Sequence, residues 1–179
     1  RVFMPLYSSI ASTVAHAAPV PSAQAIPLQL GAHFYRFSIL EMQLPDSSVP
    51  LYLVHCPEAY DRPTIYTQGV DEHLRFLILQ RAALETCQRL TFAPDIVHCN
   101  DWHTGLVPLM LKSLYAWDGL FAKTKSVMSI HNIGYQGIFG PHTIYDIGGE
   151  TRWLLAPDTA GGGAINWLRE GVRQAHRVT

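Results

Sequence analysis

Apolar positions recur with a helical period in one long segment, residues 70–90. Side chains three and four residues apart fall on the same face of an α-helix. The positions that would form this face are Leu74, Leu77, Ile78, Ala82, Leu84 and Cys87. Asp71 stands where a helix cap is favoured, and Pro94 follows the segment, where a helix can no longer continue. The pattern therefore predicts a helix from Val70 to Leu90 with one buried face.

Two apolar runs rich in β-branched and aromatic residues precede this helix, at residues 32–44 and 49–57. The Pro-Asp-Ser-Ser segment between them has the composition of a turn, so we expect an antiparallel hairpin. Residues 1–7 have the composition of a strand that ends at a proline. Residues 8–27 are rich in Ala, Ser and Pro and have no clear period, which is typical of a flexible surface loop.

Strand and helix patterns alternate in the second half of the chain. Short apolar runs at 95–99 and 125–132 fit buried strands, and residues 177–179 begin another one. The segments 102–117 and 165–176 fit helices. This alternation predicts parallel strands in a doubly wound, Rossmann-like α/β sheet.

A polar segment follows each of the two buried strands. The first, HCNDWH, spans residues 98–103, and the second, HNIGYQG, spans residues 131–137. In sheets of this class, ligands bind outside the carboxyl ends of the strands. If the two strands are neighbours, five side chains converge there: His103, His131, Asn132, Tyr135 and Gln136. This convergence predicts a ligand site between what we call the 98–103 turn and the 131–137 loop.

Each of these residues also has a structural interpretation. A neutral imidazole at a helix start could bind a sugar hydroxyl, but the spacing of His103 fits a capping histidine equally well. We interpret Asp101 as a helix cap and Trp102 as core packing. Gly134 and Gly137 would permit a positive φ or a close backbone approach. The Asn132 amide could likewise satisfy a turn, and the Tyr135 ring could pack against its neighbours.

Three histidines, His98, His103 and His131, raise the hypothesis of a metal site. Zinc sites favour tight local pairs such as HExxH, which the chain lacks, so we expect no metal. The 131–137 loop has neither the GxGxxG spacing nor the lysine of a phosphate-binding loop. There is no GxSxG nucleophile motif either. We therefore expect no cofactor and no covalent nucleophile of these kinds.

Composition narrows the partners. The chain has 179 residues, one domain's length on the usual prior, and 48% of them are hydrophobic. The net charge of −1 does not favour a nucleic-acid partner. No apolar run reaches the roughly 20 residues of a membrane helix, so no membrane partner is expected. The three cysteines are far apart, which predicts buried reduced thiols.

Six segments carry a resemblance to a known family. They read RVFMPLY, VPLYLVHCPEAYDR followed two residues later by IY, DEHLRFLILQRAALETCQRL, PDIVHCNDWHTGLVPLMLK, TKSVMSIHNIGYQGIF and INWLREGVRQAHRVT. NDWHTGL followed by IHNIGYQGIF is the most specific part, and the likeness covers nearly all of the chain except residues 8–27. The chain resembles the N-terminal domain of bacterial glycogen synthases and plant starch synthases.

The resemblance implies that residues 1–179 are an incomplete N-terminal, acceptor-side domain of a two-domain, GT-B type glycosyltransferase without its C-terminal nucleotide-binding domain. It implies transfer of glucose from ADP-glucose or UDP-glucose to the non-reducing end of an α-1,4-glucan. The anomeric configuration would be retained, and no metal would be required. The partners would be the nucleotide-sugar donor and the glucan acceptor. The location would be the bacterial cytoplasm, or the plastid for a plant protein.

The resemblance also implies roles for individual residues. His103 matches the family's active-site histidine, which contacts the donor glucose, and is the candidate catalytic residue. The residues that match the loop lining the sugar site are His131, Asn132, Tyr135, Gln136 and Gly137. Asp71 aligns with an acidic position on the acceptor side.

The chain departs from the family pattern in its phosphate-binding groups. A KxGGLxD loop is expected before Arg1 and is absent, as are the cationic clamp and carboxylate of the C-terminal domain. Stabilising a leaving diphosphate needs such groups, so we expect the chain alone to be inactive. Two alternatives stay open: a non-catalytic glucan-binding remnant, and another two-domain enzyme such as a sucrose-type synthase, against which the 131–137 loop argues.

Overall fold

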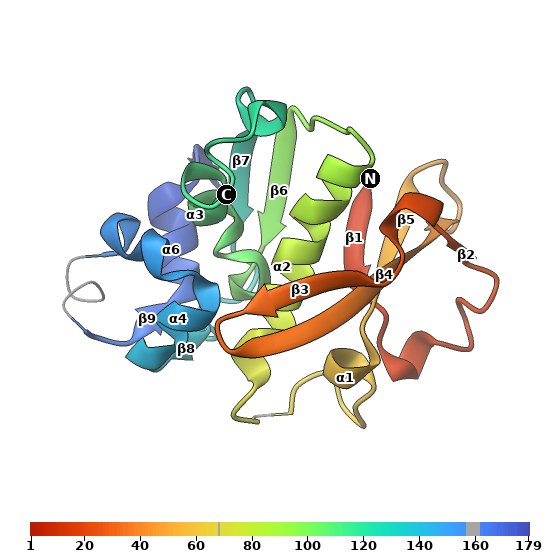
Figure 1. Cartoon of the computed structure of the whole chain (residues 1–179), viewed down its shortest axis with the longest axis horizontal. Coiled ribbons are helices and arrows are strands. Elements are labelled where there is room, and N and C mark those ends of the chain that lie inside the picture. The colour runs from red at the N-terminus through yellow and green to blue at the C-terminus, as the bar shows by residue number, and fades with distance from the viewer. Residues whose placement is uncertain (68, 157–161) are drawn as a thin grey trace. The chain divides into compact units, whose positions relative to one another are not determined.

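The computed structural model describes residues 1–67, 69–156 and 162–179 (Figure 1). The chain divides into two compact units, residues Arg1–Leu90 and Thr91–Thr179. We call them unit 1 and unit 2 and describe each by itself.

Unit 1 contains a mixed sheet. Its strands are β1 (Val2–Pro5), β2 (Ala18–Pro19), β3 (Ile26–Leu30), β4 (His33–Gln43) and β5 (Pro50–His55). The order is β1-β5-β4-β2, and β3 pairs with the first half of β4. β1 runs parallel to β5, whereas β4 and β5 are antiparallel, with Leu40 opposite Leu53. The predicted hairpin is therefore confirmed.

The segment 8–27 contains more regular structure than its composition predicts. It holds the short 3-10 helices η1 (Ser8–Ile10) and η2 (Pro21–Ala23) as well as β2, and β3 begins inside it. Val14 and Val20 are buried, and Val14 packs with Leu51 and Leu53 of β5. The prediction of an irregular segment is wrong for these parts, because isolated apolar residues between breakers can still fill gaps in a core. The flexibility of the segment stays a prediction.

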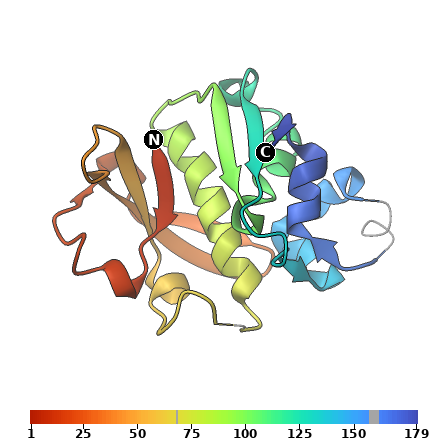
Figure 2. The same cartoon turned by 180° about the vertical axis from the view of Figure 1, so that it is seen from behind.

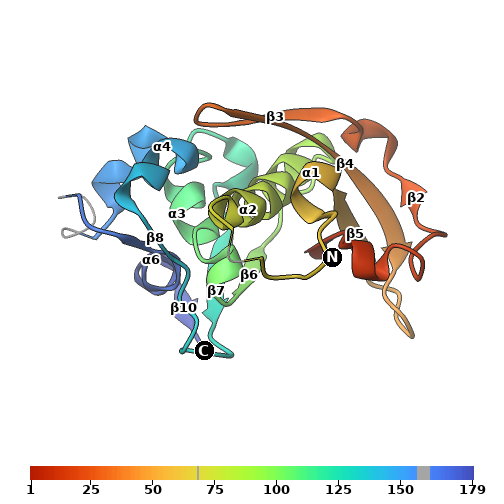
Figure 3. The ribbon, with the colours of Figure 1, turned by 90° about the horizontal axis from the view of Figure 1, so that it is seen from below.

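The predicted long helix is present as α2 (Glu72–Arg89), and a short helix, α1 (Pro57–Tyr60), precedes it. All six positions of its expected apolar face are buried. α2 lies against β1 and β5 (Figure 2), and α1 lies beside it (Figure 3). The proposed cap is wrong: the Asp71 side chain makes no capping bond and pairs with Arg62 instead. An arginine within reach of the carboxylate competes successfully with the helix N–H groups.

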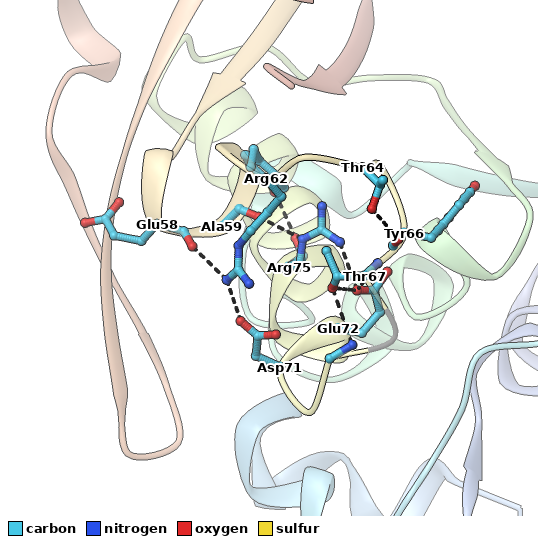
Figure 4. Close-up of polar contacts among 11 residues, drawn as sticks. Glu58, Ala59, Arg62, Thr64, Tyr66, Thr67, Asp71, Glu72 and Arg75 are labelled. Atoms are coloured by element: carbon cyan, nitrogen blue, oxygen red, sulfur yellow. Dashed lines mark hydrogen bonds and ion pairs between the residues drawn. The ribbon is translucent and has the colours of Figure 1, made fainter. Parts of the chain in front are cut away.

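A buried ion pair joins the start of α2 to α1 and to the loop between them (Figure 4). Arg75, whose side chain is 1% exposed, donates from Nη1 to Glu72 Oε2 at 2.9 Å and from Nε to the Ala59 carbonyl at 2.7 Å. The Thr67 hydroxyl donates to the same Glu72 oxygen at 2.6 Å. The Tyr60 hydroxyl donates to the Arg75 carbonyl at 2.8 Å. Three segments thus share one desolvated pair of charges.

Unit 2 contains a parallel sheet of β6 (Ile96–Asn100), β7 (Lys125–Ser129) and β10 (Arg177–Val178), in the order β10-β7-β6. A short antiparallel pair, β8 (Ile138–Phe139) and β9 (Ile165–Asn166), forms a separate ribbon. Among the described residues of unit 2, the α-helices are α3 (Val107–Lys112), α4 (Ile144–Ile147) and α6 (Trp167–Gln174). The 3-10 helices are η3 (Trp102–Thr104), η4 (Gly119–Phe121), η5 (Pro141–Thr143) and η6 (Gly149–Leu154). The predicted parallel strands are confirmed.

Three predictions for the helices and strands of unit 2 need correction. The helix expected over residues 165–176 begins only at Trp167, because Ile165–Asn166 pair with β8 as the strand β9. The helix expected over residues 102–117 is divided into η3 and α3 and ends at Lys112; Pro108 stands in the first turn of α3, where its missing N–H costs nothing. β6 is not buried on both faces, since Cys99 is buried but Ile96 is 60% exposed. Five residues are too few to distinguish a strand buried on both faces from a half-buried strand, whose outer face here carries Ile96, His98 and Asn100.

α6 packs directly on the turn that follows η3. A methyl group added at Gly171 would lie 2.8 Å from the Gly105 carbonyl oxygen, and one added at Gly105 would lie 2.9 Å from the Trp167 carbonyl carbon. Both distances are too short for a side chain. Glycine at both positions therefore allows the two backbones to approach each other.

The three cysteines are free and buried, as predicted. Burial raises the pKa of Cys56 and of Cys99 to about 12 and that of Cys87 to about 11. Thiols with such pKa values stay protonated at neutral pH and are poor nucleophiles. Among the described residues, no helix has the length and hydropathy that crossing a bilayer requires.

The Arg75–Glu72 pair provides a test of this packing. We expect Arg75→Ala to lower the free energy of unfolding by about 3–5 kcal/mol, because Glu72 would keep its burial and lose its counter-charge. Urea unfolding followed by far-ultraviolet circular dichroism measures the change. Arg81→Ala is the control: Arg81 pairs with Glu85 on the same helix at partly exposed positions, and about 1 kcal/mol or less is expected. Equal losses in the two variants would contradict the assignment.

Candidate functional site

The two polar segments leave the same edge of the unit 2 sheet. β6 and β7 are adjacent and parallel, and Asn100, the last residue of β6, is opposite Ser129, the last residue of β7. The Asp101 N–H donates to the Ser129 carbonyl at 2.9 Å and extends this pairing one residue further. The 98–103 turn and the 131–137 loop therefore begin side by side, as the sequence predicts.

Asp101 connects the two segments. Its carboxylate oxygen Oδ1 accepts hydrogen bonds from two successive backbone N–H groups, those of His131 at 2.8 Å and Asn132 at 3.2 Å. Its side chain makes no capping bond to η3, so the interpretation of Asp101 as a helix cap is wrong. Its backbone has φ 54° and ψ −175°, which only glycine adopts readily. Such a conformation costs an aspartate about 1–3 kcal/mol.

Asn100 adds a side-chain bond between the segments. Its Oδ1 lies 2.9 Å from His131 Nε2, and in this arrangement the imidazole nitrogen is the donor. The Asn100 N–H donates to the Thr104 hydroxyl at 2.6 Å, and that hydroxyl donates to the Asn100 carbonyl at 3.0 Å. Thr104 thus closes the turn between β6 and η3, a role that was expected of Asp101 as a helix cap.

The Trp102 side chain packs against the 131–137 loop. It is 7% exposed, as predicted for core packing, and contacts the rings of Phe139 and Trp167. Gly137, with φ +60°, lies against the indole, and a methyl group there would lie 2.7 Å from Trp102 Cδ2. The close approach and the positive φ both require glycine at position 137.

The far end of the 131–137 loop is tied to the start of α6. Trp167 N–H donates to the Gly137 carbonyl at 3.0 Å, and Leu168 N–H donates to the Gln136 carbonyl at 3.1 Å. Asn166 Nδ2 donates to Gln136 Oε1 at 2.6 Å, while Gln136 Nε2 donates to the Ile133 carbonyl at 3.1 Å. The Gln136 side chain is therefore engaged within the protein at both of its polar atoms.

The remaining candidates of unit 2 differ in exposure. His103 is half-buried, its ring lies on Trp102 with a centroid separation of 4.1 Å, and its Nε2 atom is buried. Asn132 is exposed and accepts from the Gly134 N–H at 3.0 Å, so it serves a turn at the least. Tyr135 is 69% exposed and presents its ring to the surface.

Asp71 belongs to unit 1 and is described by itself. Its Oδ2 lies 2.6 Å from Arg62 Nη2, which also donates to the Glu58 carbonyl at 3.0 Å (Figure 4). Both side chains of the pair are 30% exposed. The carboxylate is therefore accessible but already neutralised by a cation.

The site presents uncharged polar groups. The 98–103 turn and the 131–137 loop contain no lysine or arginine, and the carboxylate of Asp101 is directed at backbone N–H groups. Hydroxyl groups suit such a surface better than a phosphate does. Within residues 1–67, 69–156 and 162–179, no group of three or more His, Cys, Asp or Glu is placed to hold a metal ion. His98 Nε2 lies 2.6 Å from Ser129 Oγ.

Asn100, Thr104 and Asn166 shape the site, although sequence reasoning assigned them no role. Polar residues beside a candidate motif are the available signal, but nothing in a sequence states that an amide on one loop reaches a residue about thirty positions away. For Asp101 the sequence predicts a local partner in the helix that follows, whereas its carboxylate bonds to the 131–137 loop.

Comparison with known proteins first defines the class. The chain superimposes on the catalytic domain of starch synthase IV from Arabidopsis thaliana, a structure bound to ADP and acarbose, with a TM-score of 0.83 and 22% sequence identity. The match covers 99% of this chain and 36% of that one. The chain thus has the fold of the matching part of that catalytic domain, and the predicted α/β class is confirmed.

Sequence comparison then defines the family. Residues 1–179 match the family described as starch synthase catalytic domain, and the chain belongs to this family. The glycogen synthases of Aeromonas salmonicida and Aeromonas hydrophila are 40% and 41% identical over 184 aligned residues, which cover 99% of this chain. The chain spans 36% of the length of each. The resemblance read from the sequence is therefore confirmed.

Gly137 gives a direct test of the packing of the 131–137 loop on Trp102. We expect Gly137→Ala to lower the free energy of unfolding by about 2–5 kcal/mol, because the methyl group would overlap the indole and the positive φ disfavours any side chain. Thermal or urea unfolding measures the effect. Gly119→Ala is the matched control, since a methyl group there meets no atom within 4 Å, and its effect should stay within about 1 kcal/mol. A Gly137→Ala variant as stable as this control would refute the packing of the loop on Trp102.

Proposed function

We propose that this chain is the acceptor-side part of a glycogen or starch synthase. The enzyme would transfer glucose from ADP-glucose, or UDP-glucose, to the non-reducing end of an α-1,4-glucan with retention of configuration. Family membership and the relatives named glycogen synthase support the proposal. The observation that carries it is the meeting of the 98–103 turn and the 131–137 loop at the ends of β6 and β7.

The chemistry of this junction fits a hexose. Hydroxyl groups need donors and acceptors in fixed directions, and here both loops are held by hydrogen bonds at their ends. His103 would supply an imidazole held on Trp102 next to the reacting sugar. Tyr135 would supply an exposed ring, which can lie against the apolar face of a sugar. Asp71, on unit 1, would act on the acceptor side.

The junction lacks the groups that would stabilise a leaving diphosphate. Charge developing on such a leaving group is stabilised by cations or N–H donors that are already in place, and neither loop has a lysine or arginine. The relatives are almost three times as long as this chain, so the remaining part of such an enzyme would supply these groups. A soluble enzyme of the bacterial cytoplasm fits the bacterial relatives best.

Activity of the 179-residue chain tests this division of roles. We expect no measurable transfer from ADP-glucose to glycogen by the chain alone, because the phosphate-binding groups are missing. A fusion in which the chain replaces the matching segment of Aeromonas hydrophila glycogen synthase should transfer glucose, as measured by incorporation of radiolabelled glucose into glycogen. An inactive fusion that is folded and still binds maltoheptaose would favour the glucan-binding remnant. Robust turnover by the chain alone would refute the division.

His103→Ala in the active fusion tests the candidate catalytic residue. We expect kcat to fall by about 100-fold or more, because a hydrogen bond that strengthens in the transition state is lost. Stability should change by about 1 kcal/mol or less, since a half-buried side chain is truncated. His142→Ala, an exposed histidine of η5, is the control and should leave kcat unchanged. An unchanged kcat in His103→Ala would make His103 a structural residue.

A further inference from the structure

We propose that Asp101 is a positioning residue of the sugar site: its carboxylate fixes the 131–137 loop in the conformation that binds the substrate. The inference rests on the proposed function for its link to catalysis, whereas its structural part stands on the contacts of unit 2 alone. It assigns a role to a residue that is not among the candidate site residues.

The hydrogen bonds of the Asp101 carboxylate hold the start of the 131–137 loop in place, and we call this arrangement the clamp. One oxygen, Oδ1, receives the N–H groups of His131 and Asn132, the first two residues of the loop, at 2.8 and 3.2 Å. An ionised acceptor makes stronger bonds to N–H donors than a neutral one does. At the other end of the loop, the carbonyls of Gln136 and Gly137 receive N–H groups from the start of α6. The three residues between these anchors include Tyr135.

The backbone of Asp101 supports the same conclusion. Its φ of 54° and ψ of −175° lie in a region that is essentially restricted to glycine. If the turn required only this conformation, glycine would satisfy it without strain. An aspartate that accepts the strain and sends its carboxylate to the loop indicates that the carboxylate is what the position requires. Strain of this kind concentrates at functional sites.

A capping role for Asp101 is not available as an alternative. η3 has three residues, and the Asp101 side chain makes no capping bond to it. The Thr104 hydroxyl closes the turn through the N–H and carbonyl of Asn100. The carboxylate of Asp101 therefore serves the loop rather than the helix.

Amide hydrogen exchange in the 179-residue chain tests the clamp without any assay of activity. Asp101→Ala should accelerate exchange of the His131 and Asn132 amides by about tenfold or more, while the amides of β7 change by less than about threefold. Asp101→Gly should show the same acceleration although its backbone is relieved of strain. Asp101→Asn, which keeps an acceptor oxygen in the same place, should be intermediate. Unchanged protection of both amides in Asp101→Ala and Asp101→Gly would overturn the proposal.

Kinetics of the same variants in the fusion with Aeromonas hydrophila glycogen synthase test the link to catalysis. Asp101→Gly should lower kcat by about 30-fold or more while its melting temperature stays at or above that of Asp101→Ala, because a displaced loop misaligns the sugar without unfolding the protein. Asp101→Asn should recover part of this loss. If kcat instead follows melting temperature, so that Asp101→Gly is the most active of the three variants, Asp101 has only a structural role. An inactive unsubstituted fusion would count against the proposed function, and hydrogen exchange would still decide the clamp.

Discussion

The pairing of β6 with β7 is the constraint on which the site depends. The two strands are parallel and in register from the pair Ile96–Lys125 to the pair Asn100–Ser129. The segments that follow the two strands therefore leave the sheet at the same edge and from paired positions. A slip of one residue would turn every side chain of β6 to the opposite face. It would also remove the Asp101 N–H from the Ser129 carbonyl, and with it the approach of the Asp101 carboxylate to the loop. The site is therefore a product of strand register, on which the individual hydrogen bonds build.

Charge is used differently in the two units. In unit 1 the Arg75–Glu72 pair is buried and joins α1, α2 and the loop between them, so the charges serve architecture. In unit 2 the charge nearest to the site, that of Asp101, is balanced by the dipoles of two N–H groups, and the remaining groups of the two loops are neutral or histidine. A neutral polar surface of this kind can distinguish the directions of hydroxyl groups, whereas a diphosphate requires cations from elsewhere. Under the proposed function, this distribution of charge would separate sugar recognition from phosphate binding.

Much of this architecture could be predicted from the sequence, because it depends on periodicity. The apolar face of α2, the β4–β5 hairpin and the parallel strands of unit 2 are long or repeated patterns that only one arrangement satisfies. The meeting of the two polar segments followed from a general rule about strand ends. The partner of Asp101 could not be predicted, because a carboxylate before a helix has a local partner in most sequences and here has a distant one. The outer face of β6 and the early end of α3 at Lys112 were missed for the opposite reason: the patterns there are too short to exclude alternatives.

Two positive-φ residues of unit 2, Asp101 and Gly137, and one close backbone approach, at Gly105, lie around Trp102. Asp101, with its positive φ, immediately precedes Trp102, and Gly137, with φ +60°, lies against the indole of Trp102. Gly105 lies against the backbone of Trp167, and the ring of Trp167 contacts the ring of Trp102. Such positions tolerate few substitutions, and together they leave the two loops little freedom to move relative to each other. A ligand that binds between rigid loops does not have to order them first, so less of its binding free energy is lost. The strain at Asp101 and the crowding at Gly137 are therefore consistent with a candidate site whose geometry is set before a ligand binds.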